Sequence, residues 1–114
     1  MKLKEHEMLA KEIYADIVYC PMQFYLLAVS NTKEHSFYFE SIRAPLINYT
    51  TLEQRYNENY SKIILKNGSN LCIVTYTSIE LFKAAMCGRH IDKWWTTTEL
   101  LPEEIRTTLL VSTL

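Results

Sequence analysis

The chain has 114 residues, 48% of them hydrophobic and 22% charged, a composition typical of one globular domain and not of a disordered chain. A formal net charge of −1 excludes the strongly basic field with which many proteins hold nucleic acid. Three scattered cysteines (Cys20, Cys72 and Cys87) predict reduced thiols, and the lack of a signal-like or membrane-length apolar stretch predicts an intracellular, cytoplasmic protein.

A helix and a buried strand are predicted at the start of the chain. Apolar residues recur at four-residue spacing over residues 3–19, with charged residues between them, so this segment predicts an amphipathic helix. Pro21 ends the helix, because the residue before a proline is disfavoured in helical geometry. The short apolar run of residues 24–30 shows no clean alternation, which is typical of a strand covered on both faces.

The segment after this strand fits two structures. Asn31, followed three residues later by Glu34, has the pattern of a helix N-cap with a supporting carboxylate, and this favours a helix. Phe37 and Phe39 alternate with polar neighbours, however, so residues 36–41 also fit a second hairpin strand.

A polar helix and a hairpin are predicted in the middle of the chain. A second capping pattern at residues 50–53 predicts a short, solvated helix that ends near Asn59. Two β-branched runs, residues 63–66 and 71–77, then flank the Asn-Gly pair at 67–68. Asn-Gly adopts the positive φ angles that a tight turn requires, so these runs predict a β-hairpin.

The last part of the chain predicts a helix, a strand and a helix. A third capping pattern at Thr77 starts a helix that Gly88 ends. The two tryptophans and the threonines of residues 93–97 favour a strand. Pro102, with two glutamates after it, starts a final helix.

This order of elements predicts an α/β fold. Alternation of helices and strands favours a small three-layer domain with a mainly parallel sheet, one β-hairpin and flanking helices. If residues 36–41 are a strand, the alternative is an α+β fold with an antiparallel sheet made of two hairpins. In either case residues 1–114 form a single domain.

Two short motifs in residues 62–104 carry a family resemblance. An Asn-Gly-Ser turn at 67–69 joins two strands, and the link Gly-Arg-His-Ile-Asp at 88–92 leads into the strand predicted at 93–97. This pattern resembles the middle of the P-loop ATPase domain of phage large terminases and related helicase-like motors. The resemblance implies that residues 3–30 correspond to the helix after the phosphate-binding loop and to the next strand.

The catalytic parts of that family have no counterpart here. The N-terminal segment contains no Gly-Lys-Ser/Thr loop, whose backbone N–H groups would wrap the phosphates. The acidic pair expected at the end of the metal-binding strand falls near Thr97 and Thr98, with only Glu99 close by. Threonine cannot replace a metal-binding aspartate. The resemblance therefore implies a scaffold that has lost ATP hydrolysis, needs no cofactor and is used for binding.

We expect a protein-binding site around the two adjacent tryptophans. Trp94 and Trp95 point to opposite faces of a strand, so both are core residues in a fully covered sheet. On an edge or half-covered sheet one of them is exposed, and exposed Trp is enriched at binding hot spots. Arg89 and His90 lie beside them in the sequence and complete this candidate site.

A nucleic-acid site is a second interpretation. Arg43, Arg55 and Lys62 supply cations and Tyr56 supplies a ring on which an unpaired base could stack. Half-buried tyrosine rings with the hydroxyl in water explain the same residues without a ligand.

Cysteine and histidine chemistry is a third interpretation. Cys87 and His90 are three residues apart, a spacing that suits a zinc site or a thiolate paired with a base. The other cysteines and histidines are scattered singly, so a buried thiol beside a surface histidine at a helix end explains the pair equally simply.

These patterns together predict a non-catalytic binding protein, an accessory or inhibitor protein of a phage or mobile element that acts on a protein partner. A nucleic-acid-associated module and a small Cys/His-dependent enzyme or metal-binding protein are the alternatives. We predict no catalytic residue and no bound metal.

Overall fold

The computed structural model describes residues 2–48, 51–76, 82–83, 89–98 and 101–113. Its helices and strands are α1 (Leu3–Tyr19), β1 (Phe24–Val29), α2 (Thr32–Arg43), the 3-10 helix η1 (Ala44–Asn48), β2 (Thr51–Arg55), β3 (Tyr60–Leu65), β4 (Asn70–Thr75), β5 (Lys93–Thr96) and α4 (Glu103–Ser112).

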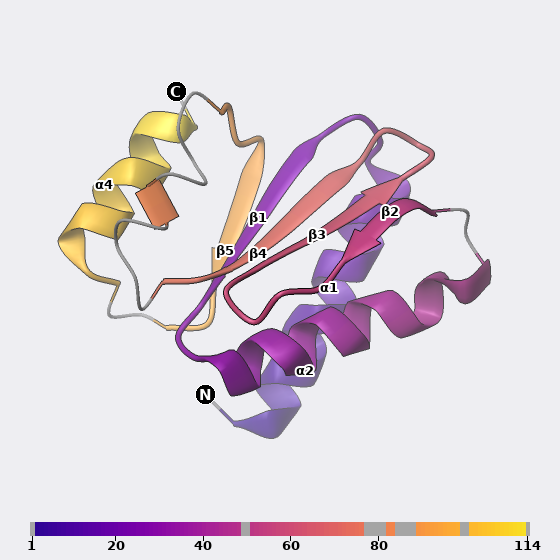
Figure 1. Ribbon diagram of the computed structural model, residues 1–114, viewed down its shortest axis with the longest axis horizontal. Coiled ribbons are helices and arrows are strands. Elements are labelled where there is room, and N and C mark those ends of the chain that lie inside the picture. The colour runs from indigo at the N-terminus through magenta and orange to yellow at the C-terminus, as the bar shows by residue number, and fades with distance from the viewer. Residues whose placement is uncertain (1, 49–50, 77–81, 84–88, 99–100, 114) are drawn as a thin grey trace.

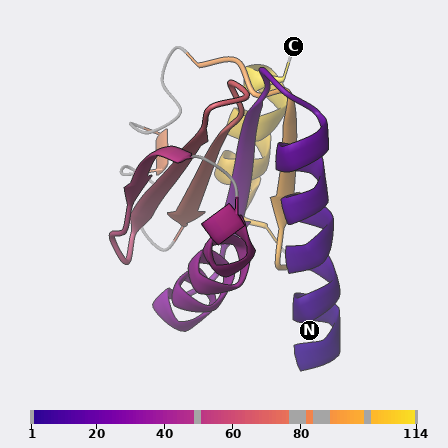
Figure 2. The ribbon, with the colours of Figure 1, turned by 90° about the vertical axis from the view of Figure 1, so that its right-hand side faces the viewer.

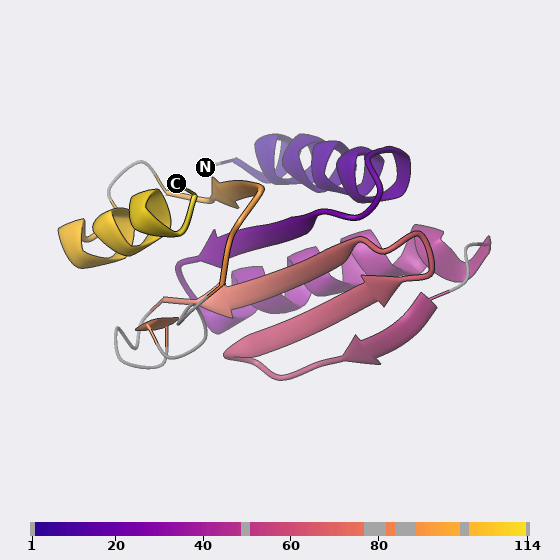
Figure 3. The same cartoon turned by 90° about the horizontal axis from the view of Figure 1, so that it is seen from above.

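The five strands form one mixed sheet in the order β2-β3-β4-β1-β5. β1 is parallel to both of its neighbours, β4 and β5, whereas β2, β3 and β4 form an antiparallel meander. Figure 3 shows β4, β3 and β2 following one another outward from β1. The α/β class is confirmed, but the prediction of a mainly parallel sheet is wrong, and so is the alternative of two antiparallel hairpins.

Helices cover the sheet on both faces. Odd-numbered residues of β1, such as Leu27, pack with α1 and α2 in one buried cluster. Even-numbered residues, such as Leu26, pack with α4 and Phe82 in a second cluster. Figure 1 shows α4 across the sheet from α1 and α2, and Figure 2 shows α1 and α2 side by side. The apolar run of β1 lacks polar alternation because both of its faces are buried.

Most predicted elements are confirmed where the structure describes them. These are the helix at residues 3–19, the strand at 24–30, the hairpin around Asn67-Gly68, the strand at 93–97 and the helix after Pro102. The ambiguous segment at 36–41 is helical, because the Asn31 side chain accepts a hydrogen bond from the Glu34 backbone N–H at 2.8 Å and caps α2. The helix predicted from Thr77 lies outside the described residues, apart from Phe82 and Lys83, which are helical.

The predicted polar helix at residues 50–59 is wrong. Residues 51–55 form β2, which pairs antiparallel with β3 and has no neighbour on its other side among the described strands. An edge strand with few buried side chains is as polar as a solvated helix, so its composition resembles one. Pairing with the apolar β3 outweighs the local capping pattern.

The Asn-Gly-Ser turn does more than join β3 to β4, because it also caps the end of α1. The Asn67 amide donates hydrogen bonds to the carbonyls of Ile17 at 3.0 Å and Val18 at 3.1 Å. The Ser69 hydroxyl donates to the carbonyl of Cys20 at 3.2 Å. The last carbonyls of a helix have no partner within the helix, so the hairpin supplies the partners that α1 lacks.

Glycine is required at the centre of this turn. Gly68 has φ +90°, and a Cβ added there would lie 2.9 Å from Cγ of Met22 and 3.2 Å from its Cα. The Met22 N–H donates to the Asn67 carbonyl at 3.2 Å, which holds the two segments together. The turn and the α1–β1 connection therefore pack too closely for a side chain at position 68.

We expect Asn67→Ala to lower the free energy of unfolding by about 2 kcal/mol, because two helix carbonyls and one turn hydrogen bond lose their partner. Chemical denaturation measures the change. Lys66→Ala, at the exposed neighbouring position, is the control and should change stability by less than about 0.5 kcal/mol. Equal effects of the two substitutions would show that the cap contributes nothing.

Candidate binding site

The carboxyl ends of β1 and β5 form the edge of the sheet at which a site is expected. After β1 the chain turns into α2 on one face, whereas β5 leads into α4 on the opposite face. In open α/β sheets, ligands bind where successive connections leave the strands in opposite directions, because the diverging loops open a crevice there. Glu34, in the first turn of α2, lies at this edge.

Three hydrogen bonds converge on one oxygen of Glu34. Its Oε1 accepts from the Ser30 backbone N–H at 3.0 Å, from the Ser30 hydroxyl at 2.7 Å and from the Thr97 hydroxyl at 2.6 Å. The bond from Thr97 links α2 to the residue that follows β5. The other oxygen, Oε2, lies 3.8 Å from Nε2 of His6, which is too far for a direct hydrogen bond.

Glu34 is ionised at neutral pH although its side chain is only 21% exposed. Burial alone would raise the pKa of its carboxyl group. The hydrogen bonds from Thr97 and Ser30, with His6 nearby, outweigh that effect and hold the pKa below its usual value of 4.5. The site therefore presents a fixed negative charge whose second oxygen keeps free acceptor capacity.

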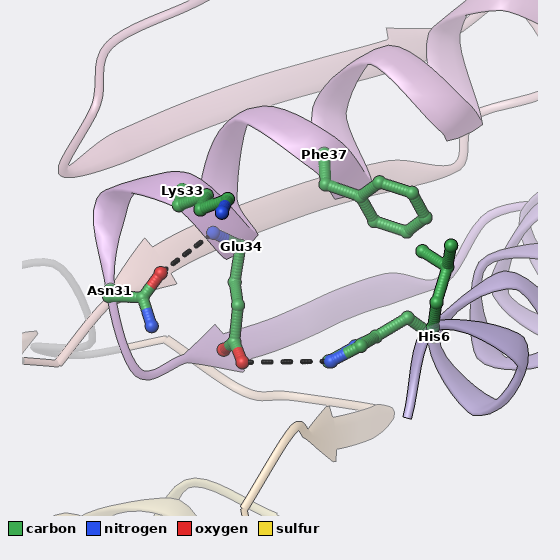
Figure 4. A pocket seen from close by; sticks show the side chains of 6 residues that line it. His6, Asn31, Lys33, Glu34 and Phe37 are labelled. Atoms are coloured by element: carbon green, nitrogen blue, oxygen red, sulfur yellow. Dashed lines mark hydrogen bonds and ion pairs between the residues drawn. The ribbon is translucent and has the colours of Figure 1, made fainter. Parts of the chain in front are cut away.

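A pocket of about 280 Å³ lies beside this carboxylate. Its lining residues are Leu3, His6, Asn31, Lys33, Glu34 and Phe37. Figure 4 shows Glu34 and His6 reaching toward each other from α2 and α1, with the Phe37 ring close to His6. Leu3 and Phe37 give the pocket apolar walls, while Glu34 and Lys33 add one anionic and one cationic side chain to its lining.

His6 is held in place by aromatic neighbours. Its Nδ1 lies 2.6 Å from the hydroxyl oxygen of Tyr38, a buried side chain of α2. The His6 ring also meets the rings of Phe37 and Tyr38 edge-to-face, with centroids 6.0 and 5.5 Å apart. These contacts fix Nε2 on the side of Glu34, so the pocket wall is preorganised.

A second polar group, His35, is fully buried beneath the same edge. Its Nε2 lies 2.7 Å from the Ser61 hydroxyl and its Nδ1 lies 2.9 Å from the Thr75 hydroxyl. The Ser61 hydroxyl oxygen in turn lies 2.9 Å from the Asn57 carbonyl oxygen, and the Thr75 hydroxyl oxygen lies 2.9 Å from the Glu58 carbonyl oxygen. His35 therefore ties α2 to the β2–β3 connection and to the end of β4.

Each of these four contacts needs one donor proton to be a hydrogen bond. A neutral histidine has one N–H and the two hydroxyls have one O–H each, so only three donor protons are present. A charged ring would complete all four hydrogen bonds. Burial, however, lowers the pKa of His35 from 6.5 to about 4, so the ring is neutral at pH 7. One hydroxyl then donates to the ring, and the matching carbonyl of Asn57 or Glu58 loses that bond.

The residues predicted for protein binding do not lie together on one exposed surface. Trp95 is only 8% exposed, stacks on Tyr25 with ring centroids 5.7 Å apart and donates its indole N–H to Glu12 at 3.1 Å. Trp95 is therefore a core residue, and this corrects its prediction as an exposed residue that contacts a partner. Trp94 points to the opposite face, as expected, and is half-buried against the α4 cluster.

Arg89 and His90 are exposed near the opposite, amino edge of β1 and β5. The Arg89 guanidinium lies 5.4 Å from the centroid of the Phe24 ring, and His90 Nε2 lies 3.3 Å from Asp92 Oδ1. Asp92 also accepts from the Phe24 backbone N–H at 2.7 Å. These contacts join the start of β1 to the segment before β5, and this end of the sheet is separate from the Glu34 pocket.

The residues predicted for nucleic-acid binding do not form one surface. Arg55 and Lys62 are directly opposite each other on β2 and β3. Tyr56 packs against Phe39, with centroids 5.1 Å apart, on the side of α2. Arg43 ends α2, which runs back from the carboxyl edge, and it pairs with Glu40 at 2.7 Å.

Among the described residues, the structure adds no further metal ligand to the candidate Cys87–His90 site. Cys87 lies outside the described residues, so its distance from His90 is not defined. Within the part of the chain that the structure describes, no three histidine, cysteine or acidic side chains gather closely enough to hold a metal ion. Burial raises the pKa of the Cys72 thiol, which favours its protonated form.

The sequence interpretation missed the pocket because its parts are far apart in the chain. Glu34 was identified only as a capping residue, and His6 was not identified as a candidate site residue. Thr97, which donates to Glu34, is 63 residues away. The one available signal was a carboxylate in the first turn of a helix that follows a buried strand directly.

Comparison of the chain with protein-family models, with curated proteins and with solved structures found no match. Among the described helices, none combines the length and the apolar character needed to cross a membrane.

We expect stability to fall as the pH drops from 6.5 to 4, because the unfolded chain binds a proton at His35 in that range and the folded chain does not. A lowering of about 2.5 pKa units corresponds to a loss of about 3 kcal/mol, which denaturation at a series of pH values measures.

His35→Gln should remove the pH dependence within that range. The dependence below about pH 4.5, to which Glu34 contributes through its lowered pKa, should remain. His90→Gln is the control, since that side chain is 59% exposed. A wild-type profile that is flat between pH 6.5 and 4 would contradict the neutral, buried state of His35.

Proposed function

We propose that this domain is a non-catalytic binding module that contacts a protein partner and holds one basic side chain of that partner in the Glu34 pocket. The observation that carries the proposal is that the two carboxylate oxygens of Glu34 have different hydrogen-bond partners. Oε1 is saturated by Ser30 and Thr97, whereas Oε2 faces a small pocket without a direct hydrogen bond from His6.

Charge supports a cationic ligand. A carboxylate with a lowered pKa stays anionic at neutral pH, and its hydrogen bonds to Ser30 and Thr97 fix its position before a ligand arrives. Hydrogen bonds between ionised groups are stronger than neutral ones, and partial burial reduces the screening by water. Both factors favour the ammonium group of a lysine or the guanidinium group of an arginine.

The size and walls of the pocket support a single side chain as the ligand. A volume of about 280 Å³ is at the lower limit for small-molecule sites, which makes a nucleotide a poor fit. Leu3, with 64% of its surface exposed, and the Phe37 ring provide apolar contact for an aliphatic stem. Lysine and arginine bury such stems while their charged ends reach a polar partner.

We also propose that the scaffold is a terminase-like P-loop fold that has lost its nucleotide site, in a cytoplasmic accessory or inhibitor protein of a phage or mobile element. The arrangement of β1 between β4 and β5, with the Asn-Gly-Ser hairpin on one side, supports this proposal. After β5, where that family carries metal-binding carboxylates, Thr97 donates its hydroxyl to Glu34.

Nucleic-acid binding is a second candidate, because Arg55 and Lys62 lie directly opposite each other on the face that also carries Tyr60. Two adjacent cations beside a tyrosine ring suit a phosphate and a stacked base. Salt-sensitive binding of a single-stranded oligonucleotide that Lys62→Gln weakens would favour this candidate over the protein-binding proposal.

The protein-binding proposal is tested with Nα-acetyl-lysine N-methylamide, observed by NMR titration. We expect saturable, millimolar binding that shifts the signals of His6, Glu34 and Phe37, because one charge-assisted contact with an apolar stem provides only a few kcal/mol. The norleucine analogue, which has the stem without the charge, should bind at least tenfold more weakly.

Glu34→Gln should abolish the lysine-specific shifts, whereas Glu40→Gln, an exposed carboxylate on the same helix, should leave them unchanged. Equal shifts from the lysine and norleucine compounds, or retention of binding in Glu34→Gln, would rule out the carboxylate as the recognition element.

Mg-ATP should leave the melting temperature unchanged, because the chain has no phosphate-binding loop and the pocket is small. A concentration-dependent rise in the melting temperature would show that a nucleotide binds the folded protein. Thermal unfolding at several Mg-ATP concentrations, with Mg²⁺ alone as the control, distinguishes the two results.

A further inference from the structure

β2 forms one free edge of the described sheet. It pairs with β3 on one side, and no other described strand lies on its outer side (Figure 3). An edge strand directs the N–H and C=O groups of alternate residues outward, where they can pair with another strand. The side chain of Leu52, in β2, is 66% exposed, and that of Tyr56, the residue after β2, is 50% exposed.

The charges on this edge alternate in sign around Gln54. Glu53 pairs with Ile64 and Arg55 pairs with Lys62, so the two charged side chains point to the same face of the sheet. The Arg55 guanidinium lies 3.1 Å from the carboxylate of Glu53. Arg55 also lies directly opposite Lys62, an arrangement of like charges that destabilises a sheet. An acidic residue on the outer side of Arg55 would offset this repulsion.

We propose that β2 pairs antiparallel with β2 of a second copy of this chain, about a two-fold axis through Gln54. In this register Gln54 lies opposite Gln54 of the second copy. Each Glu53 lies opposite an Arg55, and this happens twice because the interface is symmetric. The acidic residue that Arg55 lacks on its outer side is then supplied by the second copy, and the two sheets become continuous.

The charges select this register over its neighbours. A shift of the pairing by two residues in one direction places Glu53 opposite Glu53, and the same shift in the other direction places Arg55 opposite Arg55. A shift by one residue moves the charged side chains to opposite faces. Only the pairing centred on Gln54 joins every charge to its opposite, so the edge is complementary to itself.

The other free edge, at β5, is less suited to a second copy. Lys93 is paired with Asp16 at 2.6 Å, and the Trp95 side chain is buried against α1. β2 also lacks the lysines and prolines with which natural edge strands discourage pairing. The bulge between Thr51 and Glu53 limits the regular segment to a few residues.

The interface is small, so the dimer is reversible. A pairing of three residues per strand, residues 53–55, buries less than the roughly 1,200 Å² of a standard stable interface. We expect dissociation constants in the range of high micromolar to millimolar. This self-association uses a different surface from the Glu34 pocket and does not depend on the proposed function.

Sedimentation equilibrium and NMR diffusion up to about 1 mM protein test the proposal. The wild type should associate, with signals of residues 53–55 shifting with concentration. Glu53→Arg alone and Arg55→Glu alone each place like charges across the axis and should weaken association at least tenfold. Circular dichroism checks that each variant is folded, which is expected because both positions are on the outer edge.

Mixing the two single variants is the decisive measurement. The Glu53→Arg strand carries arginine at both charged positions and the Arg55→Glu strand carries glutamate at both, so the two strands are complementary. An equimolar mixture should therefore associate although neither variant does alone. The double variant Glu53→Arg/Arg55→Glu should associate like the wild type. A monomeric wild type at about 1 mM, single variants that associate normally, or a mixture that stays monomeric would each overturn the proposal.

Discussion

The fold depends on the burial of β1 on all sides. Its six residues are apolar, and five of them are buried, so both faces must be covered and both edges paired. α1 and α2 cover one face and α4 covers the other, while β4 and β5 pair in parallel with its two edges. Parallel neighbours require crossover connections, and α2, which lies in the connection from β1 to β4, also covers one face of the strand. One strand thus accounts for most of the architecture.

The same constraint explains how much of the fold the sequence predicts. α1, β1 and the Asn-Gly hairpin carry their signals within a few residues, as a helical period, an apolar run and a turn pair. β2 does not, because an edge strand is stabilised by its partner and keeps polar side chains toward water. Trp94 and Trp95 show a related limit. Their opposite directions follow from strand geometry, but which of them is buried depends on α1, which lies far away in the sequence.

The site was less predictable than the fold for the same reason. Glu34 and His35 are adjacent residues of α2 that are both ionisable and largely shielded from water, but Glu34 is charged and His35 is neutral. Glu34 stays charged because hydroxyl and N–H donors converge on it, whereas His35 stays neutral because its burial disfavours the charged ring. Both outcomes depend on β3, β4 and β5, and neither follows from the order of residues around the N-cap Asn31.

The capping of α1 by the Asn-Gly-Ser turn has a consequence for the order of folding events. The carbonyls of Ile17 and Val18 receive their hydrogen bonds from Asn67, 50 and 49 residues later in the chain. Helix α1 is therefore completed by a turn that is synthesised much later than the helix itself. Its last turn and the hairpin gain protection together, as one cooperative unit that spans more than half of the chain. Such distant closure slows folding relative to a protein whose helices are capped by their own neighbours.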